Sequence, residues 1–278
     1  MNYRHAYHAG NFADVMKHSA LALVIDHMKQ KEKPFFLLDT HAGTGLTDLT
    51  GEEAQKTGEF HDGIMRIMAD ASPHAALAPY LAALARLGCI GPSPSSYPGS
   101  PLIARELARD DDRLAFCELH PEDAASLKAL FRRDPQVSVH EMNGYTALKA
   151  MLPPKERRGL VLIDPPFEAR DEFATLLEGL SDALERWATG TYLIWYPVKD
   201  PSVSGAFLDA LERNGPAKTM MAELYIRAVD PARMSGCGLV IVNPPWTLKE
   251  TLTDLYGWLA EKLAQGAGAR SRVEWLKP

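Results

Sequence analysis

The sequence contains few cysteines, and those it has are scattered. Cys89, Cys117 and Cys237 show no Cys-x-x-Cys spacing. This pattern fits a reducing compartment and argues against both a disulfide framework and a zinc cluster. His5 and His8 also lack a cysteine or carboxylate at ligand spacing, so we expect no metal site.

Long apolar runs and an excess of positive charge are missing as well. The apolar stretches near residues 159–163 and 238–242 have the length of a strand, far below the roughly 18 to 20 residues of a membrane span. The first 18 residues carry charges where a signal peptide needs apolar residues, so we expect a cytoplasmic protein without membrane contact. A balance of 30 Lys and Arg against 36 Asp and Glu gives a charge of −6. That excludes a general basic coat for nucleic acid but allows a local basic surface.

The sequence is rich in short apolar runs that alternate with helical stretches. Its 278 residues, 46% of them hydrophobic, suit one large α/β domain with an insertion. Apolar spacings of three and four predict a helix over residues 12–30 with Asn11 as its cap, and a shorter helix over residues 101–109. Buried strands are predicted over residues 35–39, 113–118, 136–142, 159–164, 191–197, 221–229 and 238–246.

This order of elements predicts a Rossmann-like α/β fold with a seven-stranded, mostly parallel sheet and helices on both faces. About nine residues separate the last two strands, too few for a helical crossover, so the last strand should be antiparallel. The chain runs about 80 residues from Asp39 to Glu118, where a dinucleotide-binding fold needs roughly 20. We therefore expect a small helical insertion at residues 47–99, with residues 1–46 and 100–278 forming the main domain.

A turn containing two glycines, Asp39-Thr-His-Ala-Gly43-Thr-Gly45, follows the first strand. It lies where an open α/β sheet binds its ligand, and glycine lets the backbone approach that ligand closely. The G-x-G-x-x-G fingerprint is not met, so the turn alone indicates either a nucleotide site or an ordinary turn, in which His41 satisfies local backbone groups. Glu118 ends the next strand and is either an acceptor for ribose hydroxyls or a surface acid.

The motif Asp164-Pro165-Pro-Phe167 directly follows the fourth strand. Prolines have no N–H, so they leave carbonyl oxygens available, and a carboxylate beside a carbonyl suits the two N–H donors of an exocyclic amine. Phe167 would supply a stacking platform for a planar base. A proline-rich loop without function is the alternative. Asn243-Pro-Pro-Trp246 has the same pattern after the last strand, and we interpret it as a structural turn.

These motifs together resemble a known enzyme family. DTHAGTG, the strand ending at Glu118 and DPPF, in this order, are similar to class I S-adenosylmethionine-dependent amino-methyltransferases. The closer resemblance, running from end to end, is to the RlmJ-type 23S ribosomal RNA adenine-N6 methyltransferases. It is carried by YRHAYHAGNFADVMKH, FLLDTHAGTG, YPGSPLIAR, ELHP, RRGLVLIDPPFE, IWYPV and IVNPPW.

The resemblance implies S-adenosylmethionine as cofactor and 23S ribosomal RNA as partner. Nothing in the sequence points to an obligate protein partner, so we expect none. The cofactor contacts that it implies fall on Lys17, His18, His41, Ser100, Glu118, Asn143, Gly144 and Asp164. The glycine turn adds Asp39 and Gly43 as candidates, while His18 could equally be a capping or packing residue. The family often has Asp where this chain has Asn143, and Tyr where it has Phe167. Catalysis falls on Asp164, and contact with RNA on Tyr3.

The mechanism expected from these parts begins with an adenine that leaves its stack. Phe167 stacks on the base, while Asp164 and the Pro165 carbonyl accept the two N6 hydrogens and orient the nitrogen for in-line methyl transfer. The arm with Tyr3, Arg4, His5 and His8 and the insertion at 47–99 would form two walls around an RNA hairpin. A DNA adenine-N6 methyltransferase, a protein glutamine-N5 methyltransferase and a non-catalytic S-adenosylmethionine-binding protein remain as alternatives.

Overall fold

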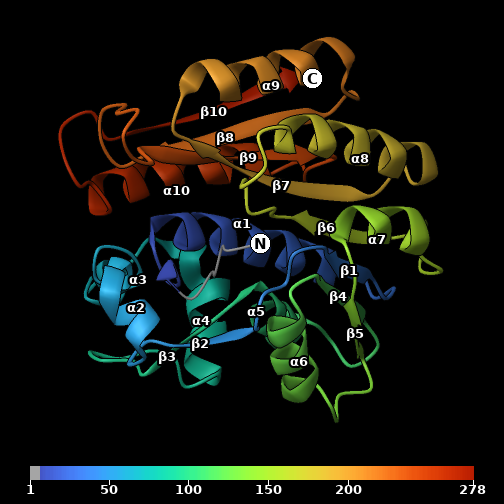
Figure 1. Ribbon diagram of the computed structural model, residues 1–278, viewed down its shortest axis with the longest axis horizontal. Coiled ribbons are helices and arrows are strands. Elements are labelled where there is room, and N and C mark those ends of the chain that lie inside the picture. Colours follow the sequence, from blue (N-terminus) through green and yellow to red (C-terminus); the bar gives the residue numbers. More distant parts are fainter. Residues whose placement is uncertain (1–6) are drawn as a thin grey trace.

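A computed structural model describes residues 7–278 and shows a central sheet covered by helices on both faces (Figure 1). The sheet has eight strands in the order β10-β8-β9-β7-β6-β1-β4-β5. Their bounds are β1 Phe36–Asp39, β4 Arg113–Glu118, β5 Val137–Glu141, β6 Gly159–Ile163, β7 Thr191–Val198, β8 Thr219–Tyr225, β9 Gly236–Val242 and β10 Arg270–Lys277.

The side chains of neighbouring strand residues alternate between two apolar clusters, one on each face of the sheet. Leu37 of β1 packs into the first cluster and Leu38 into the second. The first cluster includes residues of α1 (Phe12–Lys29), α5 (Ser100–Leu107), α6 (Pro121–Leu130) and α10 (Leu248–Lys262). The second includes residues of α7 (Gly144–Met151), α8 (Glu172–Arg186) and α9 (Pro201–Asn214). Both faces are therefore buried, as the apolar strand sequences require.

The seven predicted strands are all present, and the prediction of an antiparallel pair near the C-terminus is confirmed. β9 runs antiparallel to both of its neighbours, β7 and β8. The predicted number of strands is wrong, because β10 adds an eighth strand that pairs antiparallel with β8. Its sequence RSRVEWLK is largely polar and much of it is exposed, as expected for an edge strand, so it carries no apolar run.

Residues 46–98 form short elements between β1 and α5. β2 (Leu46–Asp48) pairs antiparallel with β3 (Ser96–Pro98) where the segment leaves and rejoins the main fold. Between them lie α2 Glu52–Thr57, η2 Glu59–His61, α3 Ile64–Met68, η3 Ala75–Leu77 and α4 Ala78–Arg86. The buried Tyr80 and Leu84 of α4 share one apolar cluster with Leu21 of α1. The division into a main domain and an insertion at 47–99 therefore stays a prediction, because the two parts share a core.

Candidate active site at the carboxyl edge of the sheet

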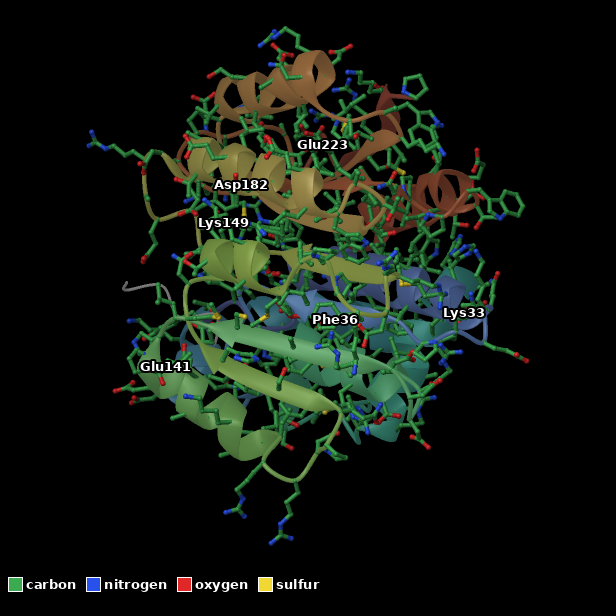
Figure 2. The ribbon with its side chains drawn as sticks, turned by 90° about the vertical axis from the view of Figure 1, so that its right-hand side faces the viewer. Lys33, Phe36, Glu141, Lys149, Asp182 and Glu223 are labelled. Atoms are coloured by element: carbon green, nitrogen blue, oxygen red, sulfur yellow. The ribbon has the colours of Figure 1, made fainter. Side chains whose placement is uncertain are left out.

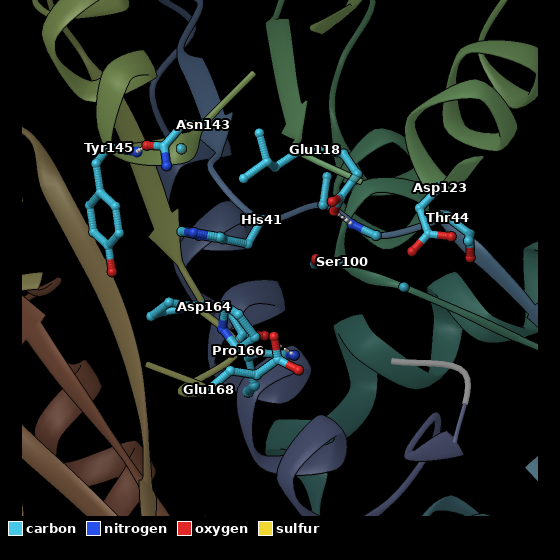
Figure 3. Close-up of a pocket in the computed structure, with 18 of the residues that line it drawn as sticks. His41, Thr44, Ser100, Glu118, Asp123, Asn143, Tyr145, Asp164, Pro166 and Glu168 are labelled. Atoms are coloured by element: carbon cyan, nitrogen blue, oxygen red, sulfur yellow. Dashed lines mark hydrogen bonds and ion pairs between the residues drawn. The ribbon is translucent and has the colours of Figure 1, made fainter. Parts of the chain in front are cut away.

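A cavity of about 350 Å³ opens at the carboxyl ends of the central parallel strands (Figure 3). The strand register brings these ends together, since Asp39 lies opposite Phe116 of β4 and Leu162 of β6. Glu118 and Asp164 approach the same space from β4 and β6. The predicted site residues that line the cavity are Lys17, His18, His41, Gly43, Ser100, Glu118, Asn143, Gly144, Asp164 and Pro165.

The glycine turn and Glu118 hold each other in place. The backbone N–H of Gly43 donates to Glu118 Oε2 at 2.8 Å, and the N–H of His120 donates to Oε1 at 2.7 Å. Gly43 has a φ of +60°, which favours glycine, and a Cβ there would meet no atom within 4 Å. The turn therefore leaves open space beside a fixed carboxylate whose remaining lone pairs can accept further hydrogen bonds.

Asp39 lies beneath the turn and does not line the cavity. Its Oδ2 accepts from Ser100 Oγ at 2.6 Å, and its Oδ1 accepts from the backbone N–H of His41 at 3.2 Å. Burial raises the pKa of the Asp39 carboxyl to about 6, against the effect of these hydrogen bonds. In the structure Asp39 thus supports the turn from behind, and a direct cofactor contact stays a prediction.

His41 and Gly144 form the wall next to α7. The His41 ring nitrogen Nδ1 shares a hydrogen bond with Thr40 Oγ1 at 2.8 Å, and the ring meets Tyr145 edge-on at 5.6 Å between centroids. Burial lowers the pKa of His41 to about 4, so the imidazole is neutral at pH 7. A Cβ on Gly144 would lie 2.3 Å from the Thr40 carbonyl oxygen, so only glycine permits this close approach of the two segments.

Asn143 has a structural role that the sequence analysis missed. Its Oδ1 accepts from the backbone N–H groups of Tyr145 at 2.9 Å and Thr146 at 3.2 Å, and so caps the start of α7. An aspartate would make the same cap, so the exchange of Asp for Asn keeps the helix end intact. What changes is the other side-chain atom, which is an amide donor in place of a carboxylate oxygen.

Lys17 is ion-paired with the candidate catalytic carboxylate. Its Nζ lies 2.5 Å from Asp164 Oδ2 and 3.1 Å from Asp14 Oδ1. The Lys17 side chain is only 5% exposed and that of Asp164 16%. The sequence resemblance placed Lys17 at the cofactor, whereas the geometry shows that it also holds Asp164 in position.

His18 connects the site to residues 46–98. Its Nδ1 shares a hydrogen bond with Tyr97 Oη at 2.8 Å, and Tyr97 Oη lies 2.7 Å from Tyr80 Oη. The rings of His18 and Tyr97 are also stacked, with centroids 5.8 Å apart. His18 therefore packs and lines the cavity at once, so the two interpretations of this residue are compatible.

Phe167 differs from the other predicted site residues in its surroundings. It has a φ of +50°, which is uncommon for an aromatic residue, and it is not among the residues that line the cavity. Its ring packs against Phe173 at 4.7 Å and Trp195 at 5.8 Å between centroids. Pro165 and Pro166 line the cavity in its place, so stacking of a base on Phe167 stays a prediction.

The Asn243 motif lies at the opposite edge of the sheet, because β9 runs antiparallel to β7. Asn243 has a φ of +51°, and its Nδ2 donates to the carbonyls of Ala188 at 2.9 Å and Gly190 at 2.8 Å. These bonds stabilise a turn, as the sequence predicted. The turn lies away from the cavity that holds Asp164, because it is at the other edge of the sheet.

Of the predicted RNA-contacting arm, Tyr3, Arg4 and His5 lie outside the described residues, while His8 lies within them. The first described part of the chain contacts the segment 46–98 directly. His8 Nδ1 lies 3.1 Å from Glu59 Oε2, and Asn11 Nδ2 donates to the same oxygen at 2.9 Å.

Most of the charged side chains that line the cavity are acidic. Its described lining includes Glu118, Asp123, Asp164, Glu168 and Glu172, and Lys17 is the one lysine or arginine among them. Because His41 is neutral at pH 7, this wall favours a cationic ligand. Within residues 7–278 no group of three or more His, Cys, Asp or Glu side chains is arranged to hold a metal ion. No helix in that range is long and apolar enough to cross a bilayer.

Comparison with known proteins confirms the family predicted from the motifs. The family model described as ribosomal RNA large subunit methyltransferase D, RlmJ, matches residues 32–277. Ribosomal RNA large subunit methyltransferase J of Haemophilus influenzae is 41% identical, and that of Escherichia coli 39%; each alignment covers 100% of this chain and 99% of the relative. A crystal structure of a Legionella pneumophila protein, 33% identical, superposes with a TM-score of 0.89 over 96% of this chain and 98% of its own. The chain belongs to the RlmJ family of ribosomal RNA large subunit methyltransferases.

Proposed function

We propose that this chain transfers a methyl group from S-adenosylmethionine to N6 of one adenine in 23S ribosomal RNA. The observation that carries the proposal is the position of Asp164 and its two prolines. They directly follow β6 and lie beside the Gly43 turn and Glu118, in one cavity at the carboxyl edge of the sheet. Membership of a family of ribosomal RNA methyltransferases supports the substrate class.

The residues present fit S-adenosylmethionine. The volume of about 350 Å³ lies within the range of small-molecule sites, and the acidic lining complements a sulfonium cation. Glu118, fixed by two backbone N–H groups, would accept the ribose hydroxyls. The Gly144 backbone and the Asn143 amide would face the adenine of the cofactor. When bound, the sulfonium supplies an already activated methyl group.

The side chains around Asp164 can orient an amino group without strong base chemistry. Lys17 engages Oδ2, so Oδ1 is available to accept one N6 hydrogen, and the Pro165 carbonyl can accept the other. These two contacts would aim the nitrogen lone pair at the methyl group, and the proton can leave after the nitrogen becomes cationic. Positioning and exclusion of water then supply most of the acceleration.

The first test measures methyl transfer from labelled cofactor to 23S ribosomal RNA, duplex DNA and a protein extract. We expect label in the RNA, and N6-methyladenine after nuclease digestion. Label in DNA adenine or in protein glutamine would assign one of the alternative methyltransferase classes. Cofactor binding without transfer to any of the three would indicate the non-catalytic alternative.

The second test replaces Asp164 by Asn and by Ala. Turnover should fall at least about 10²-fold, the scale of losing one key polar contact in the transition state. The matched control is Asp182→Asn, which removes another ion-paired carboxylate, 2.8 Å from Lys149 on the outer face of α7 and α8. Full turnover in the Asp164 variants, together with an inactive but folded Asn243→Ala, would reverse the assignment.

A further inference from the structure

A second cavity, of about 290 Å³, lies at the opposite edge of the sheet from the candidate active site. We call it the basic pocket and define it by Lys31, Arg157, Arg158, Asn243, Pro245 and Trp246, which are among its lining residues. They come from the turn after α1, the loop before β6 and the turn after β9. In Figure 2, Lys33 of the adjoining loop and Glu141 at the carboxyl end of β5 lie at opposite ends of the sheet.

The basic pocket is electropositive in a chain whose total charge is −6. No Asp or Glu is among its lining residues within the described chain. Lys31 and Arg157 are exposed, and neither has a carboxylate within ion-pair distance in residues 7–278. The pKa of the adjoining His27 is lowered first by burial and then by the charges of Lys31 and Arg158, with Asp26 opposing them. The positive charges of these two exposed side chains are therefore not balanced by a neighbouring carboxylate in the described part of the chain.

Arg158 organises the pocket from inside. Its guanidinium donates to the carbonyl of Lys33 at 2.5 Å and to that of Met28. These bonds fasten the turn after α1 to the loop before β6. They keep the segments that carry Lys31 and Arg157 next to each other. Both side chains line the same cavity, so both can contact one ligand.

Trp246 presents a large flat surface at the mouth of the pocket. Its side chain is 83% exposed, more than any other large apolar side chain that the structure describes. The turn that carries it is rigid, because two prolines precede it and the Asn243 amide is bonded to two backbone carbonyls. Because the backbone of this turn is fixed, less conformational entropy is lost when a ligand stacks on the indole than would be lost on a flexible loop.

We propose that the basic pocket binds an unpaired nucleotide of the ribosomal RNA substrate, away from the adenine that is methylated. The base stacks on Trp246, and Lys31 and Arg157 contact the adjoining phosphates. Aromatic stacking combined with cationic side chains is the usual chemistry of single-stranded RNA binding, and it tolerates any base. The proposal rests on the proposed function, since it takes RNA as the substrate.

The electrostatics of the candidate active site favour this assignment. Its acidic lining suits a cationic cofactor but repels phosphate, so the RNA backbone has to be held by other surfaces. At β6 the two edges are separated by five strand residues, roughly 17 Å at about 3.3 Å per residue. Protein domains that bind double-stranded RNA commonly contact about 16 base pairs of it, a longer stretch than the distance between the two edges. One folded RNA can therefore contact both edges of the sheet.

The test compares Trp246→Ala and Lys31→Gln with two matched controls, Trp275→Ala and Lys149→Gln. Trp275 is also an exposed tryptophan, 40% accessible on β10, and Lys149 is an exposed lysine on α7. Binding of 23S ribosomal RNA is measured over a range of salt concentrations with the full chain. Trp246→Ala should weaken binding about tenfold, the scale of one lost stacking contact. Lys31→Gln should reduce the slope of log K against log salt by about 1.

Activity adds a second readout. Because neither residue is near Asp164, both variants should raise KM for RNA and keep kcat, and their affinity for S-adenosylhomocysteine should not change. RNA affinity and salt slope equal to those of the controls would overturn the proposal. So would a loss of binding to protein-containing ribosomal particles with normal binding to naked RNA, since the partner would then be a protein. Failure of the proposed function itself is distinct, because it would appear in the unmutated chain as an absence of methyl transfer to RNA.

Discussion

Replacing Asp39 by Asn should stabilise the protein, and the gain should grow with pH. Burial raises the pKa of this carboxyl from 3.8 to about 6 in the folded chain. At a pH between these two pKa values, the Asp39 carboxyl binds more protons in the native state than in the unfolded state. The stability that the carboxyl contributes is therefore fully present below pH 3.8 and is lost as pH rises through 6.

The magnitude follows from the same two pKa values. A shift of roughly two pH units corresponds to about 3 kcal/mol at 1.36 kcal/mol per unit. Asparagine has the same shape and stays neutral. Its Oδ1 can accept from the His41 N–H, and its Nδ2 can donate to Ser100 Oγ, so the hydrogen bonds of the site are preserved. We expect the variant and the wild type to have similar free energies of unfolding near pH 4. Above pH 7 the free energy of unfolding of the variant should be higher by up to about 3 kcal/mol.

The assay is urea unfolding of both proteins at four pH values between about 4.5 and 7.5. Subtracting the wild-type free energy of unfolding from that of the variant removes the titration of groups that both proteins share. Asp182→Asn, the same chemical change at a surface ion pair, should stay within about 0.5 kcal/mol throughout. A difference for Asp39→Asn that does not change with pH would refute the reasoning, because the buried carboxyl would then cost nothing to ionise.

Three further predictions concern the cofactor, the core and the RNA. Glu118→Gln should raise the dissociation constant for S-adenosylhomocysteine about tenfold in calorimetry, and an unchanged value would mean that the cofactor lies elsewhere. Tyr97→Phe leaves two buried polar partners without their hydrogen bonds, so it should lower the free energy of unfolding by about 1–3 kcal/mol; an effect below 0.5 kcal/mol contradicts this. Deletion of residues 1–8 should sharply reduce RNA methylation and leave cofactor affinity unchanged. Full activity with the normal salt dependence would exclude the arm as an RNA reader.

The elements that the sequence predicted well are those whose signal is local. The strand over residues 113–118 was predicted to the residue, because an apolar run is the direct requirement for burial on both faces. The edge strand β10 was not predicted, because its sequence is polar and because it pairs with β8, a segment distant in the sequence. The contact of Lys17 with Asp164 joins residues 147 positions apart, so no local pattern reveals it.

The same distinction applies to Asn143 and Phe167. Asn143 was predicted as a cofactor contact, but a cap signal was also present, since Asn before a helical stretch is a common helix start. Phe167 was predicted as a stacking residue from the chemistry of its motif and from the resemblance of that motif to a family. Its positive φ and its aromatic neighbours arise from the loop that follows β6, and only the assembled fold displays them.

The hydrogen bonds that link His18, Tyr97 and Tyr80 limit which parts of this protein can be shortened. A segment of more than fifty residues that leaves and rejoins a sheet within a few ångströms looks like a detachable module. Here its removal would take away the two tyrosines that support His18 of the cavity wall, together with apolar side chains that pack against α1. Shortened versions of this chain should therefore lose loop tips, such as the exposed stretch around residues 91–95, and keep the helices beneath them.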